Sequence, residues 1–294
     1  MSQSGESPAH SMIDWDLAVR VGGRLVGDGP EVSRGEALAA VAELREGAVR
    51  SSPLVREFTG LVAAERTAPV LVIDRVSWVQ ANAQAFSTIL TPIADRLLAK
   101  RATPAGLGWG AKVTGAEVGL MLGFLGSKVL GQFDPFHQAP GEHGRLLLVA
   151  PNVVQIERQL GVDPHDFRLW VCLHEETHRV QFTAVPWMAD HLRGLMEAMA
   201  DSIKSDPGQL LGELSRKVAD LLSGRTDGSL IDLMTSPEQR EIVDRITGVM
   251  SLLEGHADVV MDGVGPEVIP SVTAIRNRFS QRRQGVGTLD KLLR

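Results

Sequence analysis

Tyrosine is absent from this 294-residue chain, cysteine occurs once, and aromatic residues make up only 4% of the sequence. A single cysteine cannot form an internal disulfide and gives a metal ion at most one thiolate. Disulfide scaffolds and cysteine-rich zinc modules are therefore excluded. The missing tyrosine removes a common proton donor and stabiliser of negative charge from any catalytic mechanism, which leaves histidine or arginine for that role.

A surplus of basic residues and a long uncharged run are also missing. The formal net charge is −6 at pH 7, which argues against a general binder of nucleic acid or anionic membranes. Lys112, Glu117 and Lys128 interrupt the most apolar stretch, residues 110–131, and leave fewer than the ~18 uncharged residues of a membrane span. The polar, acidic N-terminus has no secretory signal pattern. We therefore expect a cytoplasmic protein that binds neither nucleic acid nor membrane.

Hydrophobic residues make up 44% of the chain, enough for one large or two modest globular domains. Apolar residues at helical spacing predict a helical bundle in the first hundred residues. Ser33 and Glu36 have the spacing of a capping box, Pro53 is placed to begin another helix, and Asp74 can cap the next one. Within residues 110–131, glycines recur at the small-residue spacing of a close helix crossing, namely at Gly115, Gly119 and Gly123.

The middle of the chain predicts the only strand. Residues 133–144 are rich in Pro, Gly and His and indicate a loop, and residues 145–150 are a short apolar run typical of a buried strand. This strand either presents an edge to an extended peptide or lies inside a sheet. The chain then returns to helix. Residues 290–294 carry no helix-stop signal, so the protein either continues further or ends in a free helix.

We therefore expect a mainly α fold with a small β-sheet. An N-terminal helical region, residues 1–132, and a metal-site region, residues 133–294, are expected to form one integrated domain.

The segment His174-Glu175-Glu176-Thr177-His178 fits the H-E-x-x-H pattern inside a predicted helix over residues 163–182. Two histidines four residues apart project from one side of a helix, so both imidazoles can reach one metal ion. Glu175 would then stand beside the open coordination position as a base. The alternative is a pair of ordinary core histidines.

A third metal ligand must come from elsewhere. The metzincin pattern fails because Gln181 and Ala184 stand where it requires a glycine and a third histidine. Glu197 follows His178 at a spacing familiar from gluzincin aminopeptidases, but it belongs to a charged helix face that is typical of solvent exposure.

Glu254 is the preferred third ligand. The helix predicted over residues 249–261 is apolar almost all round, so we expect it to be buried, and a buried carboxylate needs a partner or a metal ion. Asp258, four residues further on, resembles the residue of thermolysin-like enzymes that accepts a hydrogen bond from a ligating histidine. Glu197 remains the alternative.

Residues 173–187 (LHEETHRVQFTAVPW) and 252–266 (LLEGHADVVMDGVGP) resemble a zincin-like metallopeptidase family found mainly in actinobacteria. Its members are commonly labelled hydrolases associated with deazaflavin-coenzyme biosynthesis, and the likeness covers most of the chain. The resemblance implies a largely helical zincin-like fold with a small sheet, and a zinc site built on His174 and His178. The chain departs from the longer zincin signature at Glu176 and Arg179, which are charged.

These residues predict a zinc-dependent hydrolase. His174, His178 and Glu254 would hold Zn²⁺ with one open position, and Glu175 would take the proton of a water that attacks a carbonyl. The substrate would be a peptide or a small amide or ester.

His256 is the first choice to stabilise the developing negative charge, with a supporting or core role as its alternative. Arg179 and His191 are weaker options. The rival hypothesis is a non-catalytic protein that keeps the metal site as a structural or partner-binding element.

Overall fold

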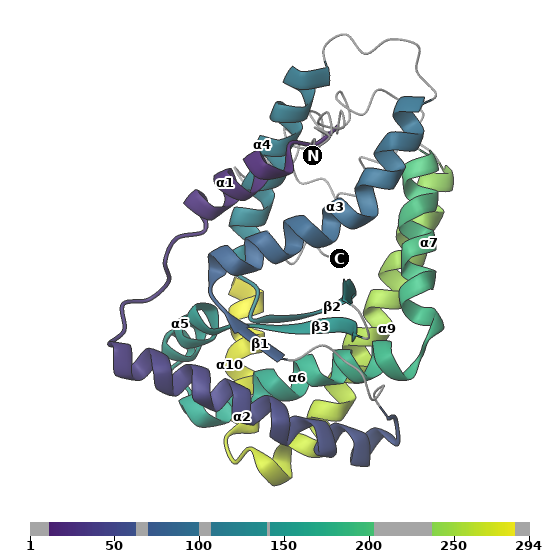
Figure 1. The fold of residues 1–294 in the computed structure, drawn as a ribbon. Coiled ribbons are helices and arrows are strands. Elements are labelled where there is room, and N and C mark those ends of the chain that lie inside the picture. Colours follow the sequence, from purple (N-terminus) through teal and green to yellow (C-terminus); the bar gives the residue numbers. More distant parts are fainter. Residues whose placement is uncertain (1–11, 63–69, 100–106, 140–141, 203–236, 286–294) are drawn as a thin grey trace, which may run out of the picture.

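The computed structural model describes residues 12–62, 70–99, 107–139, 142–202 and 237–285 (Figure 1). The helices are α1 (Trp15–Leu25), α2 (Arg34–Thr59), α3 (Arg75–Ala99), α4 (Leu107–Gly126), α5 (Ala150–Leu160), α6 (Pro164–Ala184), α7 (Trp187–Ser202), α9 (Pro237–Val268) and α10 (Val272–Gly285). The strands are β1 (Val70–Ile73), β2 (Gly131–Ala139) and β3 (Glu142–Val149). The predicted fold class, mainly α with a small sheet, is confirmed. The chain end at residues 290–294 lies outside the described residues.

Local capping signals begin several of the helices. Glu36 N–H donates to Ser33 Oγ and Ser33 N–H donates to Glu36 Oε2, so the predicted capping box of α2 is confirmed. Asp74 likewise accepts the N–H of Ser77 at 2.7 Å. The helix start predicted at Pro53 is wrong, because α2 continues through it. Ala48, Ser51 and Val55 are buried on either side of Pro53, and this packing holds the helix together although one backbone N–H is missing.

The sheet has the order β1-β3-β2, with β1 parallel and β2 antiparallel to β3. The apolar strand predicted at residues 145–150 is β3, but the loop predicted at residues 133–144 is wrong, because these residues form most of β2 and the start of β3. Within this pair of strands a buried ion pair compensates for one polar side chain of the segment. Arg145 Nε donates to Asp134 Oδ2 at 3.0 Å and both side chains are buried, while the ladder is irregular between Asp134 and Gln138.

Two hydrophobic clusters pack on opposite faces of this sheet. Leu148 of β3 belongs to a cluster shared with α2, α5, α6, α9 and α10, whereas Leu147 and Val149 belong to a cluster shared with α1, α3 and α4. This division follows from the alternation of side chains along a strand. Helix α6 therefore lies on one face of the sheet (Figure 1). The predicted boundary between residues 132 and 133 falls inside β2, and the two-region description remains a prediction.

Helices α1 and α4 cross closely, as the glycine spacing predicts. A Cβ at Gly119 would lie 2.6 Å from the carbonyl oxygen of Ala18, and one at Gly123 would lie 3.0 Å from that of Gly22. Only glycine fits at such a backbone approach. The other side of α4 is exposed, as at Trp109.

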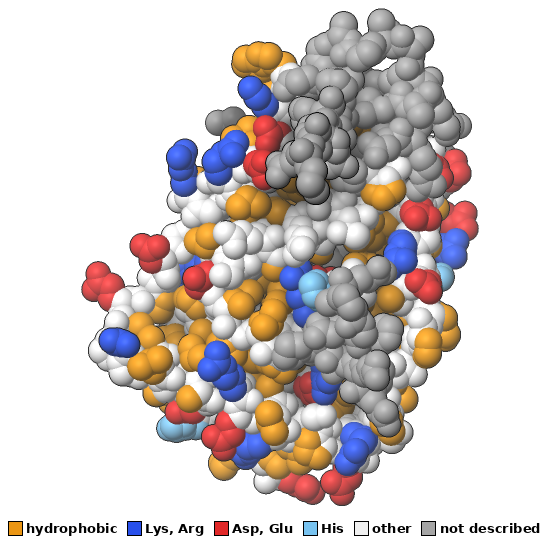
Figure 2. All heavy atoms as spheres, viewed as in Figure 1, with side chains coloured by type: hydrophobic (Ala, Val, Ile, Leu, Met, Phe, Trp, Pro, Cys, Tyr) orange, Lys and Arg blue, Asp and Glu red, His pale blue; other side chains and the backbone are white. Residues whose placement is uncertain are grey.

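Acidic and basic side chains are interspersed on the molecular face seen in Figure 2, with hydrophobic side chains between them. Among the helices in the described ranges, none combines the length and apolarity needed to cross a membrane.

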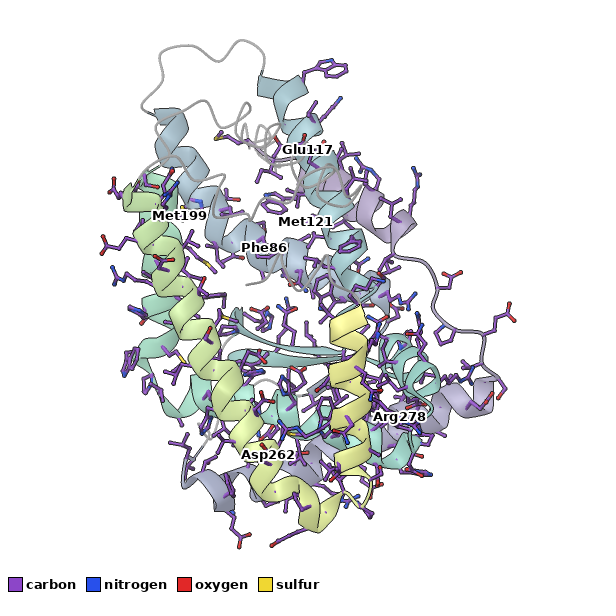
Figure 3. The ribbon with its side chains drawn as sticks, turned by 180° about the vertical axis from the view of Figure 1, so that it is seen from behind. Phe86, Glu117, Met121, Met199, Asp262 and Arg278 are labelled. Atoms are coloured by element: carbon purple, nitrogen blue, oxygen red, sulfur yellow. The ribbon has the colours of Figure 1, made fainter. Side chains whose placement is uncertain are left out.

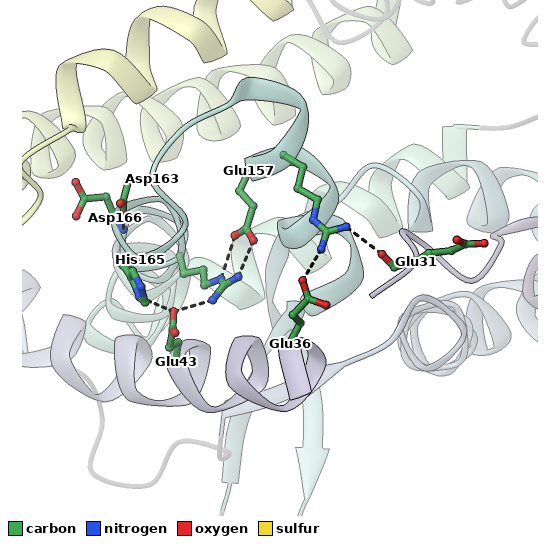
Figure 4. Close-up of polar contacts among 9 residues, drawn as sticks. Glu31, Glu36, Glu43, Glu157, Asp163, His165 and Asp166 are labelled. Atoms are coloured by element: carbon green, nitrogen blue, oxygen red, sulfur yellow. Dashed lines mark hydrogen bonds and ion pairs between the residues drawn. The ribbon is translucent and has the colours of Figure 1, made fainter. Parts of the chain in front are cut away.

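An ion-pair network fixes the beginning of α6 (Figure 4). Arg168 donates to Glu157 of α5 through both Nε and Nη2, at 3.0 and 2.6 Å, and to Glu43 of α2 through Nη1 at 2.7 Å. Burial raises the pKa of Glu157, and the Arg168 guanidinium opposes that rise. Together with the Asp163 cap, which accepts the N–H of Asp166, this network sets the position of the helix that carries the H-E-x-x-H segment.

Candidate metal centre

Two helices bring three potential metal ligands together. The Nε2 atoms of His174 and His178, both on α6, are 3.1 Å apart. Glu254 of α9 places Oε1 3.4 Å from Nε2 of His178 and Oε2 3.6 Å from Nε2 of His174. In the described part of the chain, this is the one group of at least three His, Cys, Asp or Glu side chains whose ligand atoms all lie within 4.8 Å of one another.

These separations fit a zinc ion. Ligand atoms held about 2.0–2.2 Å from one ion at tetrahedral angles lie roughly 3.3–3.6 Å from each other. The observed distances of 3.4 and 3.6 Å fall within that range, and the 3.1 Å between the two histidines lies just below it. Two imidazoles and one carboxylate are also the donor set of catalytic zinc sites that keep a fourth position open.

Glu254 reaches this group by helix packing rather than by burial. The expectation that its helix is buried all round is wrong: the Glu254 side chain is 49% exposed, and Leu252 and Val259 are exposed as well. Helix α9 packs with one side against α6 and α7, so its other side faces outward (Figure 3). Glu197, the alternative third ligand, lies on α7 and is not part of the group.

Glu175 follows His174 on α6 and has only 6% of its surface exposed. Burial raises the pKa of its carboxyl to about 7; the charge of His178 opposes this rise and that of Glu254 adds to it. A Cβ at Gly131, the first residue of β2, would lie 2.5 Å from Cγ of Glu175. The carboxylate therefore depends on a glycine at that point. The sequence pattern placed Gly131 at the end of a helix and gave no signal for this contact.

Glu176 and Arg179, the two charged departures from the zincin signature, pair with each other. The Glu176 side chain is fully buried, and Arg179 Nε donates to its Oε2 at 2.6 Å. Arg179 Nη2 donates to Ser52 Oγ of α2 at 3.2 Å. These charges therefore join α6 to α2, which weakens the case for Arg179 as a donor to substrate.

Gln181 joins the two helices of the site. Its Oε1 accepts from Nδ1 of His178 at 2.9 Å, and its Nε2 donates to the carbonyl oxygen of Leu253 and to Nδ1 of His256, both at 2.8 Å. His256, the predicted charge stabiliser, is thus one side chain removed from His178. In the sequence Gln181 stands out only as a residue that breaks the metzincin pattern, although its position three residues after His178 indicates a shared helix face.

Asp258 does not pair with His178. It is 61% exposed and lies 3.3 Å from Nη2 of Arg276 on α10, whereas Nδ1 of His178 is bonded to Gln181. His191, the other weak candidate, packs against the Trp187 ring on α7, with ring centroids 5.9 Å apart.

The two histidines of the candidate metal centre, His174 and His178, differ in their surroundings. The ring of Trp170, four residues before His174 on α6, stacks on the imidazole of His174 at a centroid distance of 6.2 Å. Burial lowers the pKa of His178, but its hydrogen bond to Glu254 and the charge of Glu175 outweigh burial and raise it to about 9. In the absence of metal, His178 is therefore held by its carboxylate neighbours.

Helix α6 carries two histidines four residues apart with a buried glutamate between them. A second helix supplies a carboxylate, and a small sheet lies alongside. Together these features define a zincin-type metallohydrolase architecture. The chain belongs to the zincin-like metallopeptidase family, which it matches over residues 13–294.

A crystal structure from Chloroflexus aurantiacus, described as "a putative hydrolase with a novel fold", is similar in sequence and fold. It has 30% sequence identity and a TM-score of 0.66, covering 94% of this chain and 78% of that one. No curated protein matches the chain.

Proposed function

We propose that the protein is a zinc-dependent hydrolase of the metallopeptidase type, acting on a peptide or on a small amide or ester. The observation that carries this proposal is the convergence of His174, His178 and Glu254 to within 4.8 Å of one another, with the buried Glu175 next to His174 on the same helix. Membership of the zincin-like metallopeptidase family and the likeness to a protein described as a hydrolase support it. The narrower resemblance to actinobacterial proteins of deazaflavin-coenzyme biosynthesis remains a prediction.

A zinc ion bound by these residues would supply Lewis-acid chemistry. Glu175 would accept the proton of the attacking water and return it to the leaving group, because its carboxyl is shielded from solvent and adjoins a proposed metal ligand on α6. His256 would donate an N–H to the developing negative charge, the role that tyrosine cannot fill in this chain.

An extended substrate would pair with β2. The apolar strand predicted from the sequence, β3, is the central strand of the described sheet, whereas β2 is an outer one. Strand β2 also begins against Glu175 through Gly131. A peptide added to its outer edge would therefore run close to the proposed base.

The test is Glu175→Gln, assayed with zinc against a panel of peptides, amides and esters. We expect turnover to fall by about 10²- to 10⁴-fold while one zinc ion remains bound, because the variant loses the base and keeps every ligand. Glu197→Gln is the matched control and should retain both zinc and turnover.

Absence of turnover by the zinc-loaded wild type throughout the panel, combined with unfolding on zinc removal, would favour the rival hypothesis of a structural metal site. Hydrolysis restricted to non-peptide substrates would assign the protein to amide or ester hydrolases.

A further inference from the structure

We propose that Gln181 is a positioning residue that determines which ring nitrogen carries the proton in the neutral rings of His178 and His256, the form in which a histidine binds a metal ion or donates a single N–H. The purpose of this arrangement rests on the proposed function, because it concerns a metal centre. The hydrogen bonds themselves belong to the protein without metal or substrate.

The Gln181 side chain is 4% exposed and uses its amide in three hydrogen bonds. One partner is a backbone carbonyl, that of Leu253, which can only accept. The amide nitrogen must therefore face Leu253, since the reverse orientation would oppose two oxygen atoms at 2.8 Å. This single backbone group sets the direction of the whole chain of hydrogen bonds.

The orientation of the amide fixes His178. Oε1 of Gln181 can only accept, so Nδ1 of His178, 2.9 Å away, must carry a proton. Nε2 of His178 is then the nitrogen left to bind a metal, and it is the atom that lies 3.1 Å from His174 and 3.4 Å from Glu254. A hydrogen bond to the second nitrogen of a ligating histidine holds the ring in its binding orientation.

The same amide fixes His256. The second N–H of Gln181 donates to Nδ1 of His256 at 2.8 Å, so this nitrogen keeps its lone pair and the proton of the neutral ring lies on Nε2. His256 is thereby prepared as an N–H donor, the form needed to stabilise negative charge.

Gln181 also positions the third ligand. It extends from α6 to the carbonyl of Leu253, the residue that precedes Glu254 on α9. One side chain therefore orients a histidine ligand and holds the helix that carries the carboxylate ligand. This explains how an exposed glutamate can be placed reproducibly beside two partly buried histidines.

The first experiment is a long-range ¹H–¹⁵N NMR correlation of the histidine rings in the metal-free wild type, with His256 assigned from a His256→Asn variant. We expect a ring protonated at Nε2 with an unprotonated Nδ1. A ring protonated at Nδ1 would overturn the proposal. Because neither zinc nor substrate is present, this result is independent of whether the protein is a hydrolase.

The second experiment measures the zinc dissociation constant of Gln181→Met, which keeps the size of the side chain and removes its hydrogen bonds. We expect zinc binding to weaken by about 10- to 100-fold and the His256 tautomer to become mixed. Gln84→Met, an exposed glutamine on α3, is the control and should change neither. If Gln181→Met binds zinc as tightly as the wild type and keeps the same His256 tautomer, the proposal is overturned. If the wild-type protein does not bind zinc at all, the result counts against the proposed function instead.

Discussion

A methyl group added at Gly131 would test whether the position of Glu175 matters while leaving every proposed metal ligand untouched. The new Cβ would lie 2.5 Å from Cγ and 2.7 Å from Cδ of Glu175, whereas ordinary contacts begin at 3.4 Å, so the carboxylate or the strand must move by roughly 1 Å. Gly131 is not among the glycines with positive φ, so the substitution is a steric change without backbone strain. We expect the free energy of unfolding to fall by about 1–3 kcal/mol through overpacking.

The main effect of Gly131→Ala should be on turnover. A displacement of about 1 Å in a reacting group can lower the rate by about 10²-fold. We therefore expect kcat/KM to fall by about that factor on the best substrate of the panel, with zinc affinity unchanged. Gly194→Ala is the matched control, because nothing lies within 4 Å of the Cβ it adds. Wild-type turnover in Gly131→Ala would refute the inference that β2 positions the proposed base.

Three further predictions concern stability. In the metal-free protein the pKa of Glu175 is raised from 4.5 to about 7 and that of His178 from 6.5 to about 9, so both hold a proton more tightly when folded. Each contributes at most roughly 3 kcal/mol to stability at low pH, and the two contributions are not additive. That of Glu175 is lost between about pH 4.5 and 7, and that of His178 between about pH 6.5 and 9. A free energy of unfolding in urea that stays constant or rises across this range would contradict the prediction. Gly119→Ala should lower the free energy of unfolding by about 1–3 kcal/mol, because its Cβ meets the α1 backbone. Gly110→Ala, in open space on α4, is the control and should not lower it. Equal melting temperatures of the two variants would count against the close crossing of α1 and α4. Arg168→Met should lower the free energy of unfolding by about 3–5 kcal/mol, because the buried carboxylate of Glu157 loses its cation. A loss below about 1 kcal/mol in chemical denaturation would show that the ion-pair network of Figure 4 does not stabilise the fold.

Local signals in the sequence were sufficient where the structure depends on neighbouring residues. The capping box at Ser33, the Asp74 cap and the glycine spacing of α4 are each decided within a few residues or by one repeated contact. The β2–β3 hairpin was not predictable in this way, because Asp134 and Arg145 satisfy each other only after the strands pair. Pro53 shows the converse, a strong local signal overridden by burial on both sides.

In the candidate site, too, the residues placed by local spacing could be predicted and those placed by helix packing could not. His174, Glu175 and His178 share one helix, so their spacing alone places them together. Glu254 was selected on expected burial, which is wrong, yet it lies beside the histidines because α9 packs against α6. The spacing of Gln181 places it on the helix face of His178, but its hydrogen bond to a carbonyl 72 residues away could not be predicted from the sequence.

The most direct test of the central claim is a crystal structure of the protein loaded with zinc. The account predicts one ion bound by Nε2 of His174 and Nε2 of His178 at about 2.0–2.1 Å and by the Glu254 carboxylate at about 2.0–2.2 Å. An ion bound elsewhere, or bound to the two histidines with Glu197 as the third ligand, would contradict it.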